Sequence, residues 1–302
     1  KLATWDGEVY MPTKGARYRG KALAKSQTLI QQLFLSKEFI NLIDLASNED
    51  LNEYEKSVIR VLNRELEIFQ KLPSKFIEKF EETVSESQIV WRNARKLDDF
   101  NLFKPNLEKI VELSKQKAEY LGYKSNPYDA LLDTFEEGLT VEFLEDYFKK
   151  VTDTVTKLLF SLKNNPNYPK KDRISSLKYD IDRAKKLNES ILEFLQYDNQ
   201  KLRLDISSHP FSEGLSTQDS RITTRYEGFD IARTVTSTIH EFGHALYFLQ
   251  HNDEINTTPL YTNYSLALHE SQSRFFENHI GRSHAFFVEN LPKFHKLGSE
   301  YE

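Results

Sequence analysis

The chain has 302 residues, of which 39% are hydrophobic and 29% charged, a balance typical of a globular protein rather than a disordered or membrane-embedded one. Its 41 Lys and Arg residues against 46 Asp and Glu residues give a net charge of −5, which argues against nucleic acid as a partner. The absence of cysteine excludes disulfides, thiolate metal sites and cysteine nucleophiles. No apolar run approaches the ~18 residues of a membrane span, and the start lacks a signal-peptide layout. We therefore expect no membrane partner, and chemistry based on histidine, carboxylate and hydroxyl groups.

Residues 17–198 are predicted to form a succession of helices. The whole sequence contains only 10 Gly and 9 Pro, and few breakers favour long elements. Apolar side chains recur at helical intervals, for example over residues 58–69 and 144–158. We expect the helices to be broken at three prolines and one loop, namely Pro73, Pro105, Pro127 and residues 164–169.

The pattern changes near residue 199. Apolar and polar residues alternate over 202–206 and again over 219–226, which predicts two strands separated by a Ser- and Gly-containing stretch. Helical spacing resumes after Asp230, which we predict to be the N-cap, and continues to His251. The second part of the chain is therefore expected to combine small strands with helices.

Histidines are confined to the last third of the sequence. All eight lie after residue 208, at positions 209, 240, 244, 251, 269, 279, 284 and 295. Residues 1–208 therefore contain no imidazole group. We therefore predict a helical scaffold over residues 1–198 and expect the residues that carry chemistry within 199–302.

The motif H-E-x-x-H occurs within the helix predicted after Asp230, as His240, Glu241 and His244. Two histidines four residues apart on a helix point the same way, so both imidazoles can reach one metal ion. The glutamate between them can act as general base toward a water that the metal activates. The motif also arises by chance on surface helices, but the apolar residues around it predict a largely buried helix. We therefore interpret it as a metal site.

A catalytic zinc ion usually has three protein ligands, so a third is expected. Tyr247 and Gln250 stand where a metzincin has glycine and histidine, which excludes that class. His251 shares the helix with His240 but lies ~16 Å further along its axis, too far to bind the same ion. A carboxylate from a following segment remains the common solution.

Four carboxylates are candidates for the third ligand, namely Asp253, Glu254, Glu270 and Glu277. The first two lie in a predicted turn, whereas Glu270 and Glu277 share a predicted helix. Arg274 follows Glu270 by four residues, a spacing suited to orienting a ligating carboxylate. The spacing favours Glu270 only modestly, because an ordinary Glu270–Arg274 surface pair is the alternative.

Five short motifs follow one another in the second half of the chain, namely His209-Pro210-Phe211, Asp219-Ser220-Arg221-Ile222-Thr223, His240-Glu241-Phe242-Gly243-His244, Leu268-His269-Glu270-Ser271-Gln272-Ser273-Arg274 and Gly281-Arg282-Ser283. Together they resemble the carboxypeptidase Taq family of metallocarboxypeptidases. Landmarks in the first half agree with the family, namely Trp5-Asp6, Tyr10-Met11-Pro12, Trp91-Arg92, Ala94-Arg95 and Tyr128-Asp129-Ala130-Leu131-Leu132. The resemblance spans nearly the whole chain, and five motifs in this order are far more specific than H-E-x-x-H alone.

The resemblance implies a mainly α fold, a multi-helix metallopeptidase like neurolysin and thimet oligopeptidase, with a small β-sheet beside the active-site helix. It implies a cytoplasmic protein, a homodimer at full length, that releases C-terminal amino acids from peptides. It also implies that His240, His244 and Glu270 bind zinc, with cobalt as a substitute. Glu241 is then the catalytic general base. Residues 1–198 are then a helical scaffold and cleft wall, and residues 199–302 the zinc-binding catalytic region.

Further residues of these motifs are predicted to bind substrate or to support the ligands, namely His209, Asp219, Arg221, Thr223, His269, Gln272 and Arg274. Asp219, Arg221 and Thr223 share one face of a predicted strand, whose exposed edge could pair with an extended peptide. An Asp219–Arg221 bridge that holds the strand is the alternative. His269 either donates a hydrogen bond to the reaction intermediate or only packs, and a histidine before proline, as at His209, is more often structural.

Two other functions remain open, an endopeptidase of the oligoendopeptidase type and a helical module that binds metal without turnover. Family chains continue beyond the point that corresponds to Glu302, and an arginine expected to hold the substrate carboxylate lies in that part. The arginines near the motifs have acidic residues close by, so none stands out as this group. We therefore expect the sequence to be a fragment that lacks the C-terminal part of the family, and residues 1–302 alone to cleave peptides poorly.

Overall fold

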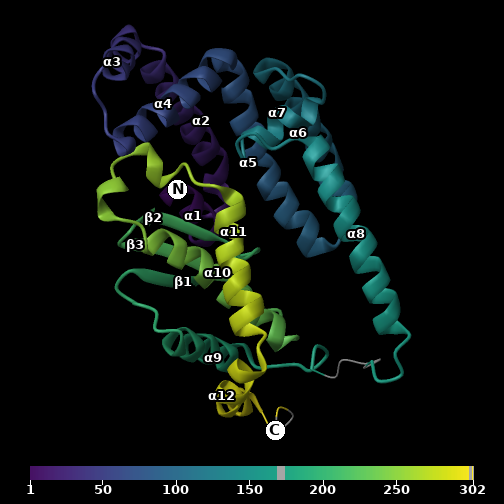
Figure 1. The fold of residues 1–302 in the computed structure, drawn as a ribbon. Coiled ribbons are helices and arrows are strands. Elements are labelled where there is room, and N and C mark those ends of the chain that lie inside the picture. Colours follow the sequence, from purple (N-terminus) through teal and green to yellow (C-terminus); the bar gives the residue numbers. More distant parts are fainter. Residues whose placement is uncertain (169–173, 299–300, 302) are drawn as a thin grey trace. The chain divides into compact units, whose positions relative to one another are not determined.

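The computed structural model describes residues 1–168, 174–298 and 301, and this part of the chain is mainly helical (Figure 1). Its α-helices are α1 (Leu2–Val9), α2 (Ala16–Phe34), α3 (Lys37–Ser47), α4 (Glu53–Lys71), α5 (Ser74–Leu97), α6 (Phe100–Leu121), α7 (Pro127–Asp133), α8 (Val141–Lys163), α9 (Ile181–Phe194), α10 (Ile231–Leu249), α11 (Leu266–Arg274) and α12 (His284–Phe294). One sheet contains β1 (Leu202–Ile206), β2 (Ser212–Ser216) and β3 (Asp219–Thr224). The prediction of a mainly α fold with a small sheet is confirmed. None of the described helices is both long and apolar enough to cross a membrane.

The chain forms two compact units, and each is described by itself. The first unit contains residues 1–9, 145–256 and 264–302, and the second contains residues 10–144 and 257–263. Every residue predicted above to bind metal or substrate lies in the first unit. The predicted division at residue 198 assigns roles to parts of the sequence rather than compact units, and it stays a prediction.

The second unit is built from helices, and its core lies where α5, α6 and α7 meet. The buried apolar side chains there are Leu72, Phe76, Ile77, Leu113, Ala118, Leu121 and Ala130. Two of the predicted breaks are confirmed, since Pro73 is the N-cap of α5 and Pro127 is the first residue of α7. Helix α8 ends at Lys163, next to the break predicted over 164–169, of which residue 169 lies outside the described part.

The break predicted at Pro105 is wrong, because Pro105 lies in the second turn of α6 and the helix continues to Leu121. Proline removes one backbone N–H and crowds the carbonyl four residues earlier, which weakens a helix locally. Later turns of α6 bury Leu113, Ala118 and Leu121 against α5 and α7. This tertiary packing outweighs the local cost of the proline.

The sheet of the first unit has the strand order β1-β3-β2, so β3 is central. β1 runs parallel to β3, with Leu202 opposite Ser220, and β2 runs antiparallel to it. The two predicted strands are confirmed, with β3 ending at Thr224 rather than Tyr226. β2 was not predicted, because its sequence Ser-Glu-Gly-Leu-Ser contains only one large apolar side chain and gives no alternating pattern. It forms because β3 offers an edge with which it can pair.

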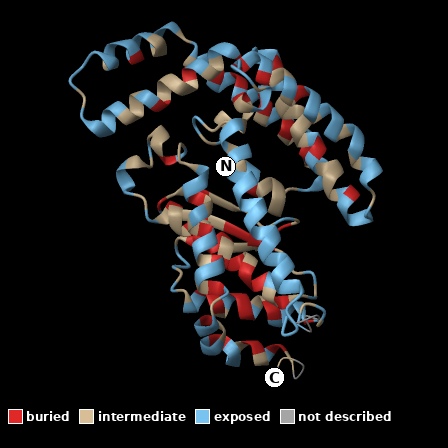
Figure 2. Ribbon diagram, turned by 45° about the vertical axis from the view of Figure 1, so that its right-hand side comes forward, coloured by how far each residue is buried: buried red, intermediate tan, exposed pale blue. Residues whose placement is uncertain are grey.

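Helix α10 is the central element of the first unit. Asp230 caps its N-terminus as predicted, with the side chain accepting a hydrogen bond from the backbone N–H of Arg233. The helix packs against the sheet as well as against α11, and both neighbours lie beside it in Figure 1. Buried residues consequently occur along its length, as Figure 2 shows for α10 and the strands. A helix enclosed in this way is a rigid support for the side chains of its one partly open face.

Candidate metal centre

Three side chains from α10 and α11 converge in the first unit. His240 and His244 lie one turn apart on α10, and Glu270 lies on α11. The Glu270 Oε2 atom is 3.2 Å from Nε2 of His244 and 3.7 Å from Nε2 of His240. One ligand atom from each residue lies within 4.8 Å of the other two. Two imidazole nitrogens and a carboxylate oxygen are the donors that a catalytic zinc ion takes from a protein, with a fourth position left open.

The other candidate ligands do not join this group. Asp253 accepts hydrogen bonds from the side chains of Thr217 and Gln218. Glu277 contacts His240 on its other ring nitrogen, Nδ1, at 3.0 Å. Within the described residues, the group of three or more side chains that could hold a metal ion is therefore His240, His244 and Glu270.

Comparison with known proteins identifies the family. The family model of carboxypeptidase Taq (M32) metallopeptidases matches residues 1–302. Thermostable carboxypeptidase 1 of Pyrococcus furiosus is 42% identical over 95% of this chain, and carboxypeptidase 1 of Bacillus subtilis is 33% identical over 95%. The solved structure of Pyrococcus furiosus carboxypeptidase (Apo-Mg) covers 99% of this chain with a TM-score of 0.85 and 41% identity. The chain belongs to the carboxypeptidase Taq (M32) family.

The match covers only part of the M32 relatives. This chain spans 60% of the Pyrococcus furiosus protein, 58% of the Bacillus subtilis protein and 62% of the solved chain. The M32 family is one of metallopeptidases, which agrees with the donor set formed by His240, His244 and Glu270.

Glu241, the second residue of the M32 chain's H-E-x-x-H motif, is almost enclosed, with 6% of its surface exposed. Burial raises the pKa of its carboxyl group to about 7, with smaller contributions from the charges of Glu270 and Glu277, against the lowering effect of a hydrogen bond from Ser212. The Ser212 hydroxyl donates to Glu241 Oε2 at 2.6 Å. A carboxyl group with a pKa near neutrality can both accept and return a proton under ordinary conditions. Ser212 belongs to β2, so no sequence signal pointed to it.

Arg274 holds two carboxylates of the helix in place. Its Nε donates to Glu270 Oε1 at 2.7 Å and its Nη1 donates to Glu277 Oε2 at 2.9 Å. Arg282 donates to the other oxygen of Glu277 at 2.8 Å. The Glu270–Arg274 pair expected from the spacing is present, and it adjoins the histidines rather than standing alone on the surface.

His269 packs behind His244. Its ring lies 4.5–4.7 Å from those of Tyr247, Phe248 and Tyr264, measured between centroids, and its Nδ1 contacts Nδ1 of His244. Burial first, and then the neighbouring His244, lower the pKa of His269 to about 3. A neutral imidazole of this kind can accept the Nδ1–H of His244 and so leave Nε2 of His244 free for a metal. The contact with Nδ1 of His244 therefore supports the interpretation that His269 packs against its neighbours.

The hydrogen bonds of His209, Asp219 and Arg221 do not involve the three converging ligands. His209 is exposed and donates from Nδ1 to the carbonyl of Pro210 at 2.6 Å, within its own loop. Arg221 pairs with Asp219 through two hydrogen bonds of 3.0 and 3.1 Å. The expected bridge between these two residues is therefore present.

Thr223 and its strand do not offer a free edge to a peptide. Its side chain is fully buried and hydrogen bonds Ser207 and the backbone N–H of Phe211. β3 is paired with β1 on one side and β2 on the other. β3 therefore has no exposed edge, and the suggestion that an extended peptide pairs with it is wrong. The strand that occupies this edge, β2, was not predicted from the sequence.

Gly243 allows α10 and α11 to approach closely. A Cβ atom at this position would lie 2.7 Å from Cα of Ser273 and 3.0 Å from the carbonyl oxygen of Gln272. Both contacts are with backbone atoms, which cannot turn aside as a side chain can. The half-buried Gln272, predicted as a supporting residue, therefore meets α10 through its main chain.

We expect Gly243→Ala to destabilise the protein. Alanine favours a helix over glycine by ~1 kcal/mol, but the overlap with α11 should cost more, giving a net loss of ~1–2 kcal/mol in the free energy of unfolding. Urea denaturation measures this loss. Gly15→Ala, at the N-cap of α2, is a control for an added methyl group without overlap, because its Cβ would lie an ordinary 3.7 Å from Met11. Equal stability of the two variants would contradict the close packing of α10 on α11.

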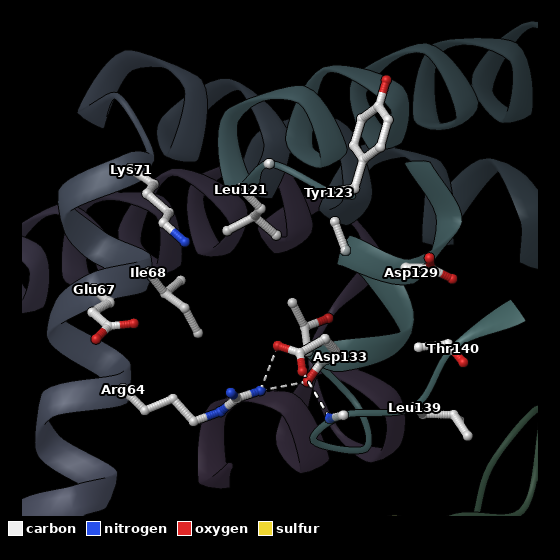
Figure 3. Close-up of a pocket in the computed structure, with 14 residues that line it drawn as sticks. Arg64, Glu67, Ile68, Lys71, Leu121, Tyr123, Asp129, Asp133, Leu139 and Thr140 are labelled. Carbon is white, nitrogen blue, oxygen red and sulfur yellow. Dashed lines mark hydrogen bonds and ion pairs between the residues drawn. The ribbon is translucent and has the colours of Figure 1, made fainter. Parts of the chain in front are cut away.

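A separate pocket of about 210 Å³ lies in the second unit, between α4, the end of α6, α7 and the segment that follows α7 (Figure 3). Arg64 reaches across it and pairs with Asp133 at 2.7 Å. None of the fourteen residues that line it is a histidine. This pocket therefore lacks the imidazole ligands that the predicted metal site requires.

Proposed function

We propose that this chain carries the catalytic centre of a zinc-dependent carboxypeptidase that releases C-terminal amino acids from peptides. His240, His244 and Glu270 bind one zinc ion, for which cobalt can substitute, and Glu241 is the general base. The convergence of two Nε2 atoms and a carboxylate oxygen within 4.8 Å carries this proposal. Membership of the M32 family and the names of its carboxypeptidase relatives support it.

A bound divalent ion supplies Lewis acidity toward the peptide carbonyl and lowers the pKa of water. Glu241 takes one proton from the attacking water as the new C–O bond forms, and returns it to the leaving nitrogen as the C–N bond breaks. Ser212 donates to the same carboxylate and restricts its orientation. The raised pKa of Glu241, about 7, suits a group that must hold the proton between these two steps.

Recognition of the substrate's free carboxylate calls for an arginine, whose planar group binds a carboxylate through two hydrogen bonds. The four arginines near the motifs already have acidic partners within 3.0 Å: Arg221 with Asp219, Arg225 with Glu227, Arg274 with Glu270, and Arg282 with Glu277. We therefore place the carboxylate-binding group in the part of the family that residues 1–302 do not span. The residues that remain proposed to bind substrate or to support the ligands are His209, Asp219, Arg221, Thr223, His269, Gln272 and Arg274.

Finer features of the protein are proposed from its membership of the M32 family. They are an architecture like that of neurolysin and thimet oligopeptidase, a homodimer at full length, and a cytoplasmic location, with peptides rather than nucleic acid or membranes as partners. The division into a scaffold over residues 1–198 and a catalytic region over residues 199–302 is also proposed.

Metal binding and turnover test this function together. We expect elemental analysis to find one divalent ion per chain after dialysis against zinc. A chelator should lower the melting temperature and zinc or cobalt should restore it, since a ligand at 100 times its Kd stabilises the fold by ~2.7 kcal/mol. Absence of a stoichiometric metal would contradict the proposal.

The choice of peptide separates the alternatives. A blocked dipeptide with a free C-terminal carboxylate should be cleaved faster than the same peptide with an amidated C-terminus. Equal rates on the two peptides would favour an endopeptidase of the oligoendopeptidase type. Stoichiometric metal without turnover of either would favour a metal-binding module, which is also the behaviour expected if carboxylate recognition needs residues outside 1–302.

A further inference from the structure

The ring of His240 lies between two carboxylates of one continuous helix. Its Nε2 is 3.7 Å from Glu270 Oε2, and its Nδ1 is 3.0 Å from Glu277 Oε2. A neutral imidazole carries its proton on one nitrogen only. Both neighbours accept but do not donate, and only Glu277, at 3.0 Å, lies within hydrogen-bond distance, so the geometry places the proton of His240 on Nδ1. Nε2 is then left with its lone pair facing Glu270 and His244.

Glu277 is more buried than a surface glutamate and accepts more hydrogen bonds. Only 10% of its side chain is exposed, compared with 44% for Glu270. One oxygen accepts from His240 and from Arg274 at 2.9 Å, and the other accepts from Arg282 at 2.8 Å. Two positive charges therefore compensate the burial of this carboxylate, and three donors restrict its rotation.

The helix that carries both carboxylates changes its winding between them. Glu270 lies in α11, whereas Glu277 lies in the π-helix Phe275–Gly281 that continues it. In a regular α-helix, residues seven apart are separated by ~10.5 Å along the axis. π-turns are rare and recur at functional sites. Here the π-turn is the segment that presents Glu277 to the far side of His240.

Gly243 of α10 and Gly281 of the π-helix allow the two helices to pack closely on either side of His240. A Cβ at Gly243 would lie 2.7 Å from Cα of Ser273, and a Cβ at Gly281 would lie 2.9 Å from Cδ1 of Ile239. The π-helix thus ends directly against the residue that precedes His240. These close contacts fix the distance from which Glu277 reaches the ring.

We propose that Glu277 is a positioning residue that fixes His240 in the tautomer with a free Nε2, and that Arg274 and Arg282 hold it for this purpose. The inference rests on the proposed function, in which Nε2 of His240 binds the metal. Glu277 itself does not bind the ion, and it acts through the imidazole. Partners of this kind typically contribute 10–100-fold to metal affinity.

Zinc affinity and the tautomer of His240 test the proposal in the purified chain. We expect Glu277→Gln to weaken zinc binding by ~10–100-fold in competition with a chromophoric chelator, while still binding one ion at saturation. In the metal-free protein, ¹⁵N NMR of the histidines should show Nδ1–H for His240, and a mixture of tautomers in Glu277→Gln. His240→Ala assigns the signal, and Glu289→Gln, an exposed glutamate of α12, is the matched control.

Each outcome decides between roles for Glu277. Unchanged zinc affinity together with an unchanged tautomer in Glu277→Gln would overturn the proposal. Loss of the ion as complete as in Glu270→Ala would make Glu277 a ligand and would also overturn it. If Glu277→Gln does not fold, Arg282→Gln decides, since it leaves the carboxylate in place with one donor fewer and should weaken zinc binding severalfold.

The design separates this inference from the proposed function. The tautomer is measured without metal, so an Nδ1–H proton that depends on Glu277 would support the positioning role even if the wild-type chain bound no zinc. Absence of zinc from the wild type would instead refute the proposed metal centre. A wild-type chain that binds zinc with His240 in the Nε2–H tautomer before metal is added would overturn the positioning role alone.

Discussion

Replacement of Glu241 by glutamine is expected to leave the metal bound and to lower turnover by at least ~10²–10⁴, the usual contribution of a general base. The amide has the shape of the carboxyl group and can still accept the hydrogen bond from Ser212. It cannot take a proton from water at any pH near neutrality. Elemental analysis measures the metal content. Turnover is measured as kcat on a blocked dipeptide, with residues 1–302 if they cleave it and otherwise with a longer chain that does.

A matched glutamate variant controls for the loss of one charge. Glu289→Gln changes an exposed residue of α12 outside the candidate site and should leave both metal content and rate unchanged. Near-normal turnover by metal-replete Glu241→Gln would show that another group accepts the proton. A loss of metal in the same variant would show instead that Glu241 supports the binding site directly.

Glu270→Ala should lose the metal ion almost entirely. It removes the carboxylate oxygen that lies closest to both histidine Nε2 atoms, at 3.2 and 3.7 Å, and two imidazoles alone do not complete a catalytic zinc site. We expect the fall in zinc affinity to exceed the ~10–100-fold typical of residues that only support a ligand. Elemental analysis after gel filtration and chelator competition give the two measurements.

Glu277→Ala is the informative comparison for this prediction, because both glutamates share Arg274 as a partner. Retention of metal by Glu270→Ala together with its loss from Glu277→Ala would show the ligand assignment to be wrong. A smaller loss in Glu277→Ala than in Glu270→Ala is the expected order. Circular dichroism of both variants excludes unfolding as the cause.

Local signals in the sequence were sufficient for the elements that carry the motif. The Asp230 cap and the apolar spacing that follows it lie within a few turns of one helix, and the structure has α10 at this place. The alternation over 202–206 and 219–226 likewise predicted two strands, and both are present, the second ending at Thr224. Such signals are readable because the period of a helix or strand is a property of a short stretch of chain.

Elements that depend on a partner were not predictable in the same way. Pro105 is a helix breaker by its own chemistry, yet α6 continues through it because later turns are buried by α5 and α7. β2 has a sequence without strand character and exists because β3 pairs with it. The same pairing removed the free edge that was expected at β3.

The sequence by itself was enough to predict the family, since H-E-x-x-H and the four motifs around it resemble the carboxypeptidase Taq family, which is the family found by comparison. Spacing alone favoured Glu270 over Glu277 only modestly, and it was the family resemblance that implied Glu270 as the third ligand. Only the tertiary structure decided that Glu270 faces Nε2 of His240 and His244 while Glu277 faces Nδ1 of His240. The physical reason is that a carboxylate's role depends on which nitrogen it approaches. That approach is set by the change from α11 to the π-helix and by the close contacts at two glycines of different helices, neither of which has a local signature in the sequence.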